Sequence, residues 1–245
     1  MVRCLADLGS EIYTVGHPLY SGCPSVTRTE SLGPIPTALP EVDVIIAPMS
    51  HTDQFGQLKA VPDKGVTIRI DDELLQSFAP GTPLFIGMAR PIVREVAERH
   101  GIRIIETAED DEIAILNSIP TAEGAIQKAM EELPVTIHGS QSIVLGFGRC
   151  GLTLARMLQG LGAKVCVVAR NPAQLARACE MGLDTAFISD LGEAIETADI
   201  VFNTVPTLIL TREILEQMSR STLIVDIASA PGGVDYAVAG DLGIR

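Results

Sequence analysis

The feature that most constrains this chain is a glycine motif within residues 142–151, which read S-I-V-L-G-F-G-R-C-G. Ser142–Leu145 is a short apolar run, typical of a buried strand, and residues 152–161 then carry apolar side chains at helical spacing. The glycines between them have the spacing G-x-G-x-x-G. Strand, glycine turn and helix in this order predict dinucleotide binding, because the N–H groups of the first helical turn face a pyrophosphate. A glycine-rich turn in another kind of α/β domain is the alternative. The residues predicted to hold the dinucleotide are Gly146, Phe147, Gly148, Arg149, Cys150 and Gly151.

Strand-like and helix-like segments alternate along the chain, which is typical of α/β folds with parallel sheets. We expect two Rossmann-like or flavodoxin-like, doubly wound parallel-sheet domains joined by a connector helix. The expected boundaries are 1–116 for a substrate-side domain, 117–134 for the connector and 135–245 for the dinucleotide-binding domain. The first domain begins without the strand that a βαβ unit needs, and no sixth strand follows residue 243 in the second. Both domains are therefore expected to be truncated.

The expected elements can be given by residue range. Strands are expected at 11–15, 42–47, 66–70, 83–86, 102–105, 142–145, 165–168, 185–188, 200–203 and 223–227. Helices are expected up to Gly9 and at 72–78, 90–100, 152–161, 172–181, 211–218 and 234–242, with residues 21–40 forming a loop. Ser118 or Thr121 is expected to cap the connector helix, which runs to Leu133, and Asp190 and Glu193 have capping-box spacing.

Composition argues against several functions. The net charge of −13 disfavours nucleic acid as a partner, and no uncharged apolar run reaches the ~18 residues that a membrane span needs. Five cysteines without a C-x-x-C pair and four scattered histidines predict a reducing cytoplasm, no disulfide framework and no metal site. Residues 133–179 hold five Arg or Lys and no Asp or Glu, which favours an anionic ligand near the glycine turn. Chance clustering on solvated helix faces is the alternative.

The residues after the second strand of the second domain predict which nicotinamide cofactor binds. A carboxylate about 20 residues beyond the glycine motif would bind the ribose 2′-hydroxyl of NAD. This chain has Arg170 and Asn171 there instead, and a guanidinium suits a 2′-phosphate, so NADP is preferred over NAD. The alternative is that Arg170 is a solvated loop residue.

Two later strands of the second domain end in polar, turn-forming segments. In a doubly wound sheet the ligand lies beyond the carboxyl ends of the strands, so these segments are expected to border the nicotinamide. For Asp226 a turn-capping role is an equal alternative. The residues concerned are Asn203, Thr204, Val205, Pro206, Asp226, Ala228 and Ser229.

Candidate acid–base groups flank the second domain. His138 precedes its first strand, at the expected mouth of a cleft between the domains, and Glu123 lies on the connector helix. Either side chain could accept a proton, and a purely structural role is the alternative for each. Cys150 is expected to be a packing residue rather than a nucleophile.

Five segments together resemble the family of the dipicolinate synthase A-subunit. They are residues 117–124 (N-S-I-P-T-A-E-G), 138–140 (H-G-S), 144–151 (V-L-G-F-G-R-C-G), 203–206 (N-T-V-P) and 226–233 (D-I-A-S-A-P-G-G). The resemblance implies a relative of the 2-hydroxyacid dehydrogenases that oxidises dihydrodipicolinate to dipicolinate, in the sporulation branch of the lysine pathway. It also implies a cytoplasmic location in the mother cell and, as partner, the flavoprotein-like B-subunit of dipicolinate synthase. Family members begin with a further strand and continue past residue 245.

The resemblance also implies a substrate with two carboxylates, for which the chain offers cationic and hydroxyl anchors. Arg90 or Arg149 would bind a carboxylate, with help from Asn117, Ser118, Thr121 and Ser140. The proton acceptor would be His138 or Glu123.

Two other functions stay open. An NADP-dependent 2-hydroxyacid dehydrogenase needs a His–carboxylate pair and an arginine soon after the fifth strand, and residues 227–244 contain neither His nor Arg. A dinucleotide-sensing regulatory module without chemistry of its own needs only the glycine turn. The sequence does not fix the oligomeric state, and a homo-oligomer is among the options.

Overall fold

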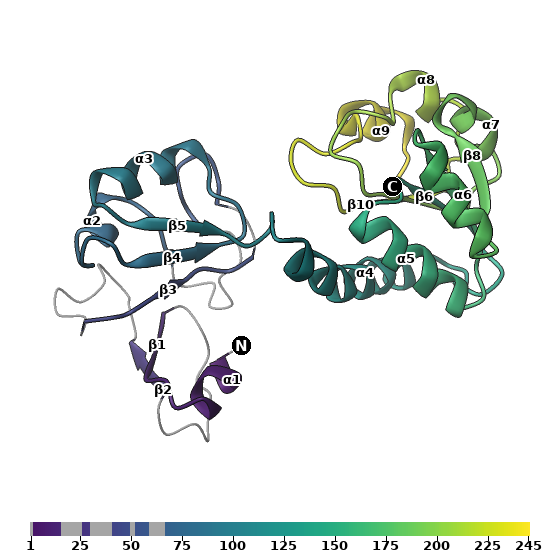
Figure 1. Ribbon diagram of the computed structural model, residues 1–245. Helices are drawn as coiled ribbons and strands as arrows, with labels where there is room; N and C mark the ends of the chain where they lie inside the picture. The colour runs from purple at the N-terminus through teal and green to yellow at the C-terminus, as the bar shows by residue number, and fades with distance from the viewer. Residues whose placement is uncertain (1, 16–25, 30–40, 50–51, 59–66) are drawn as a thin grey trace. The chain divides into compact units, whose positions relative to one another are not determined.

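The structure is a computed structural model that describes residues 2–15, 26–29, 41–49, 52–58 and 67–245 (Figure 1). The chain divides into two compact units, Met1–Ile113 and Ala114–Arg245. Within the described ranges no helix has both the length and the apolar character to cross a membrane.

Unit 1 contains a parallel sheet with the strand order β3-β4-β5. The strands are β3 (Ile45–Ile46), β4 (Pro83–Ile86) and β5 (Arg103–Glu106). Helix α3 (Pro91–Arg99) connects β4 to β5 and buries Val93, Val96 and Ala97 in the same core as Leu84 and Ile86 of β4. The other described elements of unit 1 are α1 (Val2–Asp7), α2 (Asp72–Leu75) and the parallel pair β1 (Ile12–Val15) and β2 (Val26–Thr29).

Several predictions for unit 1 need correction. The expected loop at 21–40 contains β2, which pairs with β1, and the other residues of that range lie outside the described ones. The strand expected at 42–47 is reduced to Ile45–Ile46, and the helix expected at 72–78 ends at Leu75. In place of a strand at 66–70, Arg69 forms an isolated bridge to Gln57, and residue 66 lies outside the described part.

Unit 2 contains a five-stranded parallel sheet with the order β10-β9-β6-β7-β8. Its strands are β6 (Gln141–Leu145), β7 (Lys164–Ala169), β8 (Asp184–Phe187), β9 (Ile200–Asn203) and β10 (Leu223–Asp226). The chain moves outward from β6 to β8 and then returns to the other side of β6 with β9. This reversal between β6 and β9 is the switch point at which open α/β sheets bind ligands, beyond the carboxyl ends of the strands. We call that side of a sheet its carboxyl edge and the opposite side its amino edge.

Helices cover both faces of this sheet. Val144 of β6 faces one core with α4 (Asp111–Glu132), α5 (Arg149–Gly160) and α6 (Pro172–Glu180). Its neighbours Ile143 and Leu145 face a second core with α7 (Leu191–Ile195), α8 (Arg212–Leu215) and α9 (Tyr236–Leu242). Because successive strand residues point to opposite faces, two apolar layers form around one strand. The predicted doubly wound α/β fold is confirmed.

Two helix starts in this part differ from the prediction. Helix α4 begins at Asp111, before the predicted caps, and Asp110 Oδ1 accepts from the Ile113 N–H at its start (3.1 Å). Ser118 and Thr121 therefore lie inside the helix, where they donate to the carbonyls of Ile115 (2.6 Å) and Asn117 (2.8 Å). The predicted capping box at residue 190 is wrong: the Asp190 carboxylate accepts from the Ser189 hydroxyl (3.0 Å) and makes no cap bond to α7. A short 3₁₀ turn, Ile188–Asp190, precedes α7 there.

Candidate functional site

The glycine turn lies at the switch point and is shaped by close backbone contacts. Gly146 has φ +86°, and a Cβ there would meet Thr204 Oγ1 at 2.8 Å and Val205 Cγ2 at 2.6 Å. A Cβ at Gly151 would meet the carbonyl oxygen of Gly146 at 2.2 Å. Both positions therefore require glycine so that α5 and the end of β9 can approach the turn.

The middle glycine differs from these two. Gly148 is the N-cap residue of α5, and a Cβ there would meet no atom within 4 Å. Nothing in the described part of the protein needs glycine at this position, whereas a pyrophosphate approaching the backbone does. The N–H groups of the first turn of α5 have no i−4 carbonyl and point toward this open space. The turn therefore fits a dinucleotide diphosphate.

The other predicted residues of the turn differ in environment. Phe147 is 4% exposed and belongs to the core on the α5 side, so only its backbone is available to a ligand. Arg149 is exposed. Burial raises the pKa of the Cys150 thiol despite the charge of Arg149, which fits a packing residue rather than a nucleophile.

The end of β7 presents Arg170. Its side chain is exposed and makes no hydrogen bond or ion pair to any residue in the described ranges. Asn171 has a structural role, because its side chain caps α6 by accepting from the N–H of Ala173 (2.9 Å). Arg170 thus remains available to a phosphate at the carboxyl edge.

The ends of β9 and β10 meet in a hydrogen-bonded network beside the glycine turn. Asn203 is fully buried and donates through Nδ2 to the carbonyl of Val205 (3.0 Å) and to Asp226 Oδ1 (2.9 Å). Thr204 donates through Oγ1 to the carbonyl of Leu145 (2.8 Å), which joins the end of β9 to the end of β6. The structure thus brings these predicted cofactor residues together. Their side chains bond to other groups of the protein and so hold the carboxyl edge in shape. Pro206 and Ser229 are exposed on the same two segments, and Ala228 is partly buried.

The Asp226 carboxylate organises the segment after β10. Besides Asn203, it accepts from the N–H groups of Ala228 (3.0 Å) and Gly233 (3.1 Å) and from the hydroxyl of Tyr236 (2.6 Å). Partial burial raises the pKa of Asp226, but these hydrogen bonds outweigh it and hold the pKa below its usual range. The same contact with Asp226 raises the pKa of Tyr236 to about 12. Of the two predicted roles, the contacts favour the structural one for Asp226.

Tyr236 is a site residue that the sequence does not reveal. It is the first residue of α9, a short distance along the chain beyond the polar segment that contains Asp226. No sequence pattern marks a tyrosine that folds back onto a carboxylate ten residues earlier.

The connector-helix residues are placed differently from one another. Ser118 is fully buried, and its hydroxyl contacts Thr153 Oγ1 of α5 at 2.6 Å, so it joins two helices. Asn117 is exposed and Thr121 is partly exposed. Glu123 is exposed and lines a shallow apolar groove with Met157, Gly160 and Leu161, at the end of α5 away from the glycine turn.

His138 and Ser140 lie at the amino edge of the sheet. The Gly139 N–H donates to the carbonyl of Gly162 (2.8 Å), and the His138 ring lies against Gly162, just before β7 begins. The buried Ser140 hydroxyl donates to the carbonyl of Ile137 (2.8 Å). The glycine turn comes after the other end of β6, so the structure does not bring these two residues to it.

Arg90 is the remaining predicted anchor and belongs to unit 1. It lies at the carboxyl edge of that sheet, after β4, as the N-cap residue of α3. Its Nε donates to the carbonyl of Thr52 (2.8 Å).

Comparison with known proteins agrees with this geometry. Residues 116–236 match the family described as D-isomer specific 2-hydroxyacid dehydrogenase, NAD binding domain, and residues 1–108 match the N-terminal domain of the dipicolinate synthase A-subunit. The fold and the glycine turn together with the first match define the chain as a dinucleotide-dependent oxidoreductase.

The full-length relatives are more specific. The chain is 37% identical over 246 residues to the dipicolinate synthase A-subunit of Bacillus subtilis, covering 100% of this chain and 82% of the relative. It therefore belongs to the dipicolinate synthase A-subunit family. The crystal structure of the A-subunit from Bacillus halodurans has a TM-score of 0.87 at 32% identity, covering 100% of this chain and 83% of the other. The crystal structure of the Bacillus subtilis A-subunit has a TM-score of 0.78 at 36% identity, with 100% and 81% covered.

Proposed function

We propose that this chain oxidises dihydrodipicolinate to dipicolinate with NADP, together with a second subunit, in the cytoplasm of a sporulating cell. The observation that carries the proposal is the open space at Gly148 in front of the first turn of α5, in a chain of this family. A bound nicotinamide supplies the acceptor for the hydride that leaves the substrate ring. The partner is inferred because the relatives are named as the A-subunit of a synthase.

In this proposal the backbone of residues 146–151 binds the diphosphate, with the positive end of the α5 dipole behind it. Arg170 binds the 2′-phosphate, because its guanidinium is exposed at the end of β7 and no carboxylate follows that strand. The network around Asp226 and Asn203 fixes the segments that border the nicotinamide.

Which residue accepts the proton from the substrate stays a prediction. His138 lies at the amino edge of the unit 2 sheet and Glu123 near the end of α5 away from the glycine turn, which favours structural roles for both. We therefore expect His138→Ala and Glu123→Gln to leave turnover within about threefold of wild type. A loss of ~100-fold or more in either variant would assign that residue to proton transfer.

The cofactor assignment is tested by titrating the chain with NADP and with NAD. Arg170→Ala should weaken NADP binding by about 10- to 100-fold and leave NAD binding within about threefold, since only NADP carries the 2′-phosphate. Arg156→Ala is the matched control, because Arg156 is an exposed arginine of the same basic segment, on α5. Equal NADP affinity in the two variants would contradict the choice of NADP.

The reaction is tested by following dihydrodipicolinate oxidation with this chain alone and with the second subunit added. Oxidation that requires NADP supports the proposal. Cofactor binding without oxidation in either mixture would instead favour the regulatory module.

A further inference from the structure

The carboxyl edge of the unit 1 sheet holds an arginine, Arg90, whose position is fixed by three hydrogen bonds. The backbone before Arg90 is held because the Ala89 N–H donates to Glu106 Oε1 (2.7 Å) at the end of β5. The backbone after it is held by the first turn of α3, where Val93 donates to the Arg90 carbonyl (2.9 Å). The side chain is held where Nε donates to the Thr52 carbonyl (2.8 Å).

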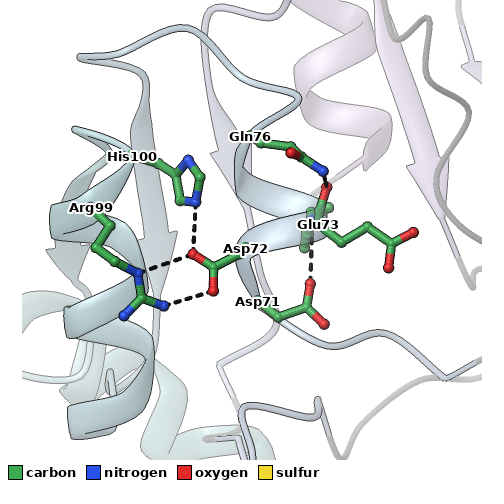
Figure 2. Close-up of polar contacts among 7 residues, drawn as sticks. Asp71, Asp72, Glu73, Gln76, Arg99 and His100 are labelled. Atoms are coloured by element: carbon green, nitrogen blue, oxygen red, sulfur yellow. Dashed lines mark hydrogen bonds and ion pairs between the residues drawn. The ribbon is translucent and has the colours of Figure 1, made fainter.

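The outer end of this guanidinium has no partner among the described residues. Neither Nη atom of Arg90 makes a hydrogen bond or ion pair with any residue that the structure describes. The neighbouring carboxylate does not neutralise it: Glu106 is engaged by the Ala89 N–H and by Arg94, and its side chain is only 10% exposed. Arg99, at the other end of α3, differs because its Nε and Nη2 both donate to the Asp72 carboxylate (Figure 2). Arg90 is thus held through Nε while its two Nη groups keep their donors for a ligand, and the paired donors of a guanidinium match a carboxylate.

Two exposed methionines lie on the same edge of the sheet as Arg90. Met88 is 46% exposed and Met49 is 38% exposed, on the segments after β4 and β3. These segments touch, because a Cβ at Gly87 would lie 1.9 Å from the Met49 carbonyl oxygen. The Met49 sulfur accepts from the Thr107 hydroxyl (3.0 Å) at the same edge. Exposed, polarizable thioethers at the edge that carries Arg90 can pack against a flat ring. In the same place the buried Thr52 hydroxyl has no partner within the described ranges.

We infer that Arg90 is the anchor for one carboxylate of the substrate, with the ring lying against Met88 and Met49. The identification of the ring as a pyridine-type dicarboxylate rests on the proposed function, whereas the anion site itself rests on the contacts of Arg90. Unit 1 therefore selects the acid and unit 2 binds the dinucleotide.

The test is calorimetric titration of the chain with dipicolinate, which needs neither turnover nor cofactor. Arg90→Gln should weaken dipicolinate binding by about 10- to 100-fold, and Arg90→Lys should be intermediate because a lysine keeps the charge but not the paired donors. Arg103→Gln is the matched control, since Arg103 is an exposed arginine at the start of β5, at the amino edge. NADP affinity, measured in parallel, should be equal in all four proteins.

Each outcome of these titrations either supports or overturns the inference about Arg90. Equal dipicolinate affinity in Arg90→Gln and Arg103→Gln, or no dipicolinate binding by the wild-type chain, overturns the inference. If Arg90→Gln fails to fold, as judged by its thermal transition, Arg90→Lys decides in the same way. Dipicolinate binding that depends on Arg90 in a chain that binds no dinucleotide would keep the anion site and overturn the proposed function.

Discussion

The carboxyl edges of the two parallel sheets are built in opposite ways. At the glycine turn of unit 2 the important positions are those where side chains are missing, Gly148 and Gly151, and the Asp226 carboxylate at the end of β10 is already hydrogen-bonded. In unit 1 the important feature is the side chain of Arg90, whose Nε donates to the Thr52 carbonyl while its Nη atoms make no hydrogen bond to the described residues. Backbone donors at a helix N-terminus suit a diphosphate that many enzymes share, whereas a positioned guanidinium suits one particular acid. The comparison predicts that the two edges can be disabled separately.

The largest expected effect comes from adding one methyl group to the unit 2 edge. In Gly151→Ala the new Cβ would lie 2.2 Å from the carbonyl oxygen of Gly146, so the start of α5 must move away from the turn. We expect a loss of at least about 2 kcal/mol in the free energy of unfolding and roughly 100-fold weaker dinucleotide binding. Denaturant unfolding and NADP titration measure the two effects, and dipicolinate binding should be retained wherever unit 1 stays folded.

Gly148→Ala is the control for this prediction. Its Cβ would meet no atom within 4 Å, so the unfolding free energy should stay within about 1 kcal/mol of wild type. NADP binding should nevertheless fall by about 10-fold or more, because the methyl group occupies the space assigned to the pyrophosphate. If this variant bound NADP as tightly as wild type, dinucleotide binding would not need a position without a side chain at residue 148. The contrast drawn between the two edges would then be wrong.

The difference between the edges also decides what could be predicted from the sequence. The glycine turn was predictable, because the spacing of Gly146, Gly148 and Gly151 is itself the geometric requirement. Whether a polar side chain is free to bind a ligand depends on partners far along the chain, which no local pattern reveals. The resemblance implies that Ser118 helps to bind the substrate, and only the structure shows that its hydroxyl contacts Thr153 Oγ1 of a different helix.

The positions of His138 and Ser140 show a second limit of prediction from the sequence. Both precede a strand in sequence, which places them at the amino edge, whereas the segments that come after the strands form the ligand edge. The direction of β6 follows from the order of strand and glycine turn in the sequence, so the position of both residues at the amino edge is predictable from the topology alone. The role of Tyr236 is not, because its contact with Asp226 depends on the path of the intervening loop.

A smaller effect is expected from the network that shapes the unit 2 edge. Asp226→Asn keeps the shape of the side chain but removes the negative charge that accepts from Tyr236 and from two N–H groups. Because the position is partly exposed, we expect the free energy of unfolding to fall by about 1 kcal/mol. The folded pKa of Asp226 is lowered, so its stabilisation is fully present above the unfolded pKa of about 4 and is lost as the pH falls through the lower folded value. Unfolding curves of wild type and variant should therefore differ at neutral pH and converge in acid. A constant difference at all pH values would show that the charge of Asp226 does not hold the segment.

The smallest effect is expected at the amino edge of unit 1, where Arg99 and His100 both contact Asp72 (2.7 and 2.9 Å; Figure 2). Hydrogen bonds from Arg99 and then from His100 lower the pKa of Asp72, so this contribution is present above the unfolded pKa of the carboxyl and is lost as the pH falls through the folded value. Because the groups are exposed, Asp72→Asn should lower the thermal midpoint only slightly, and about 1 M NaCl should remove the difference from wild type. Dipicolinate affinity should not change, since the open guanidinium of Arg90 lies at the opposite end of α3. If Asp72→Asn weakened dipicolinate binding as much as Arg90→Gln, the acid would not bind at the carboxyl edge, and the contrast between the two edges would fail.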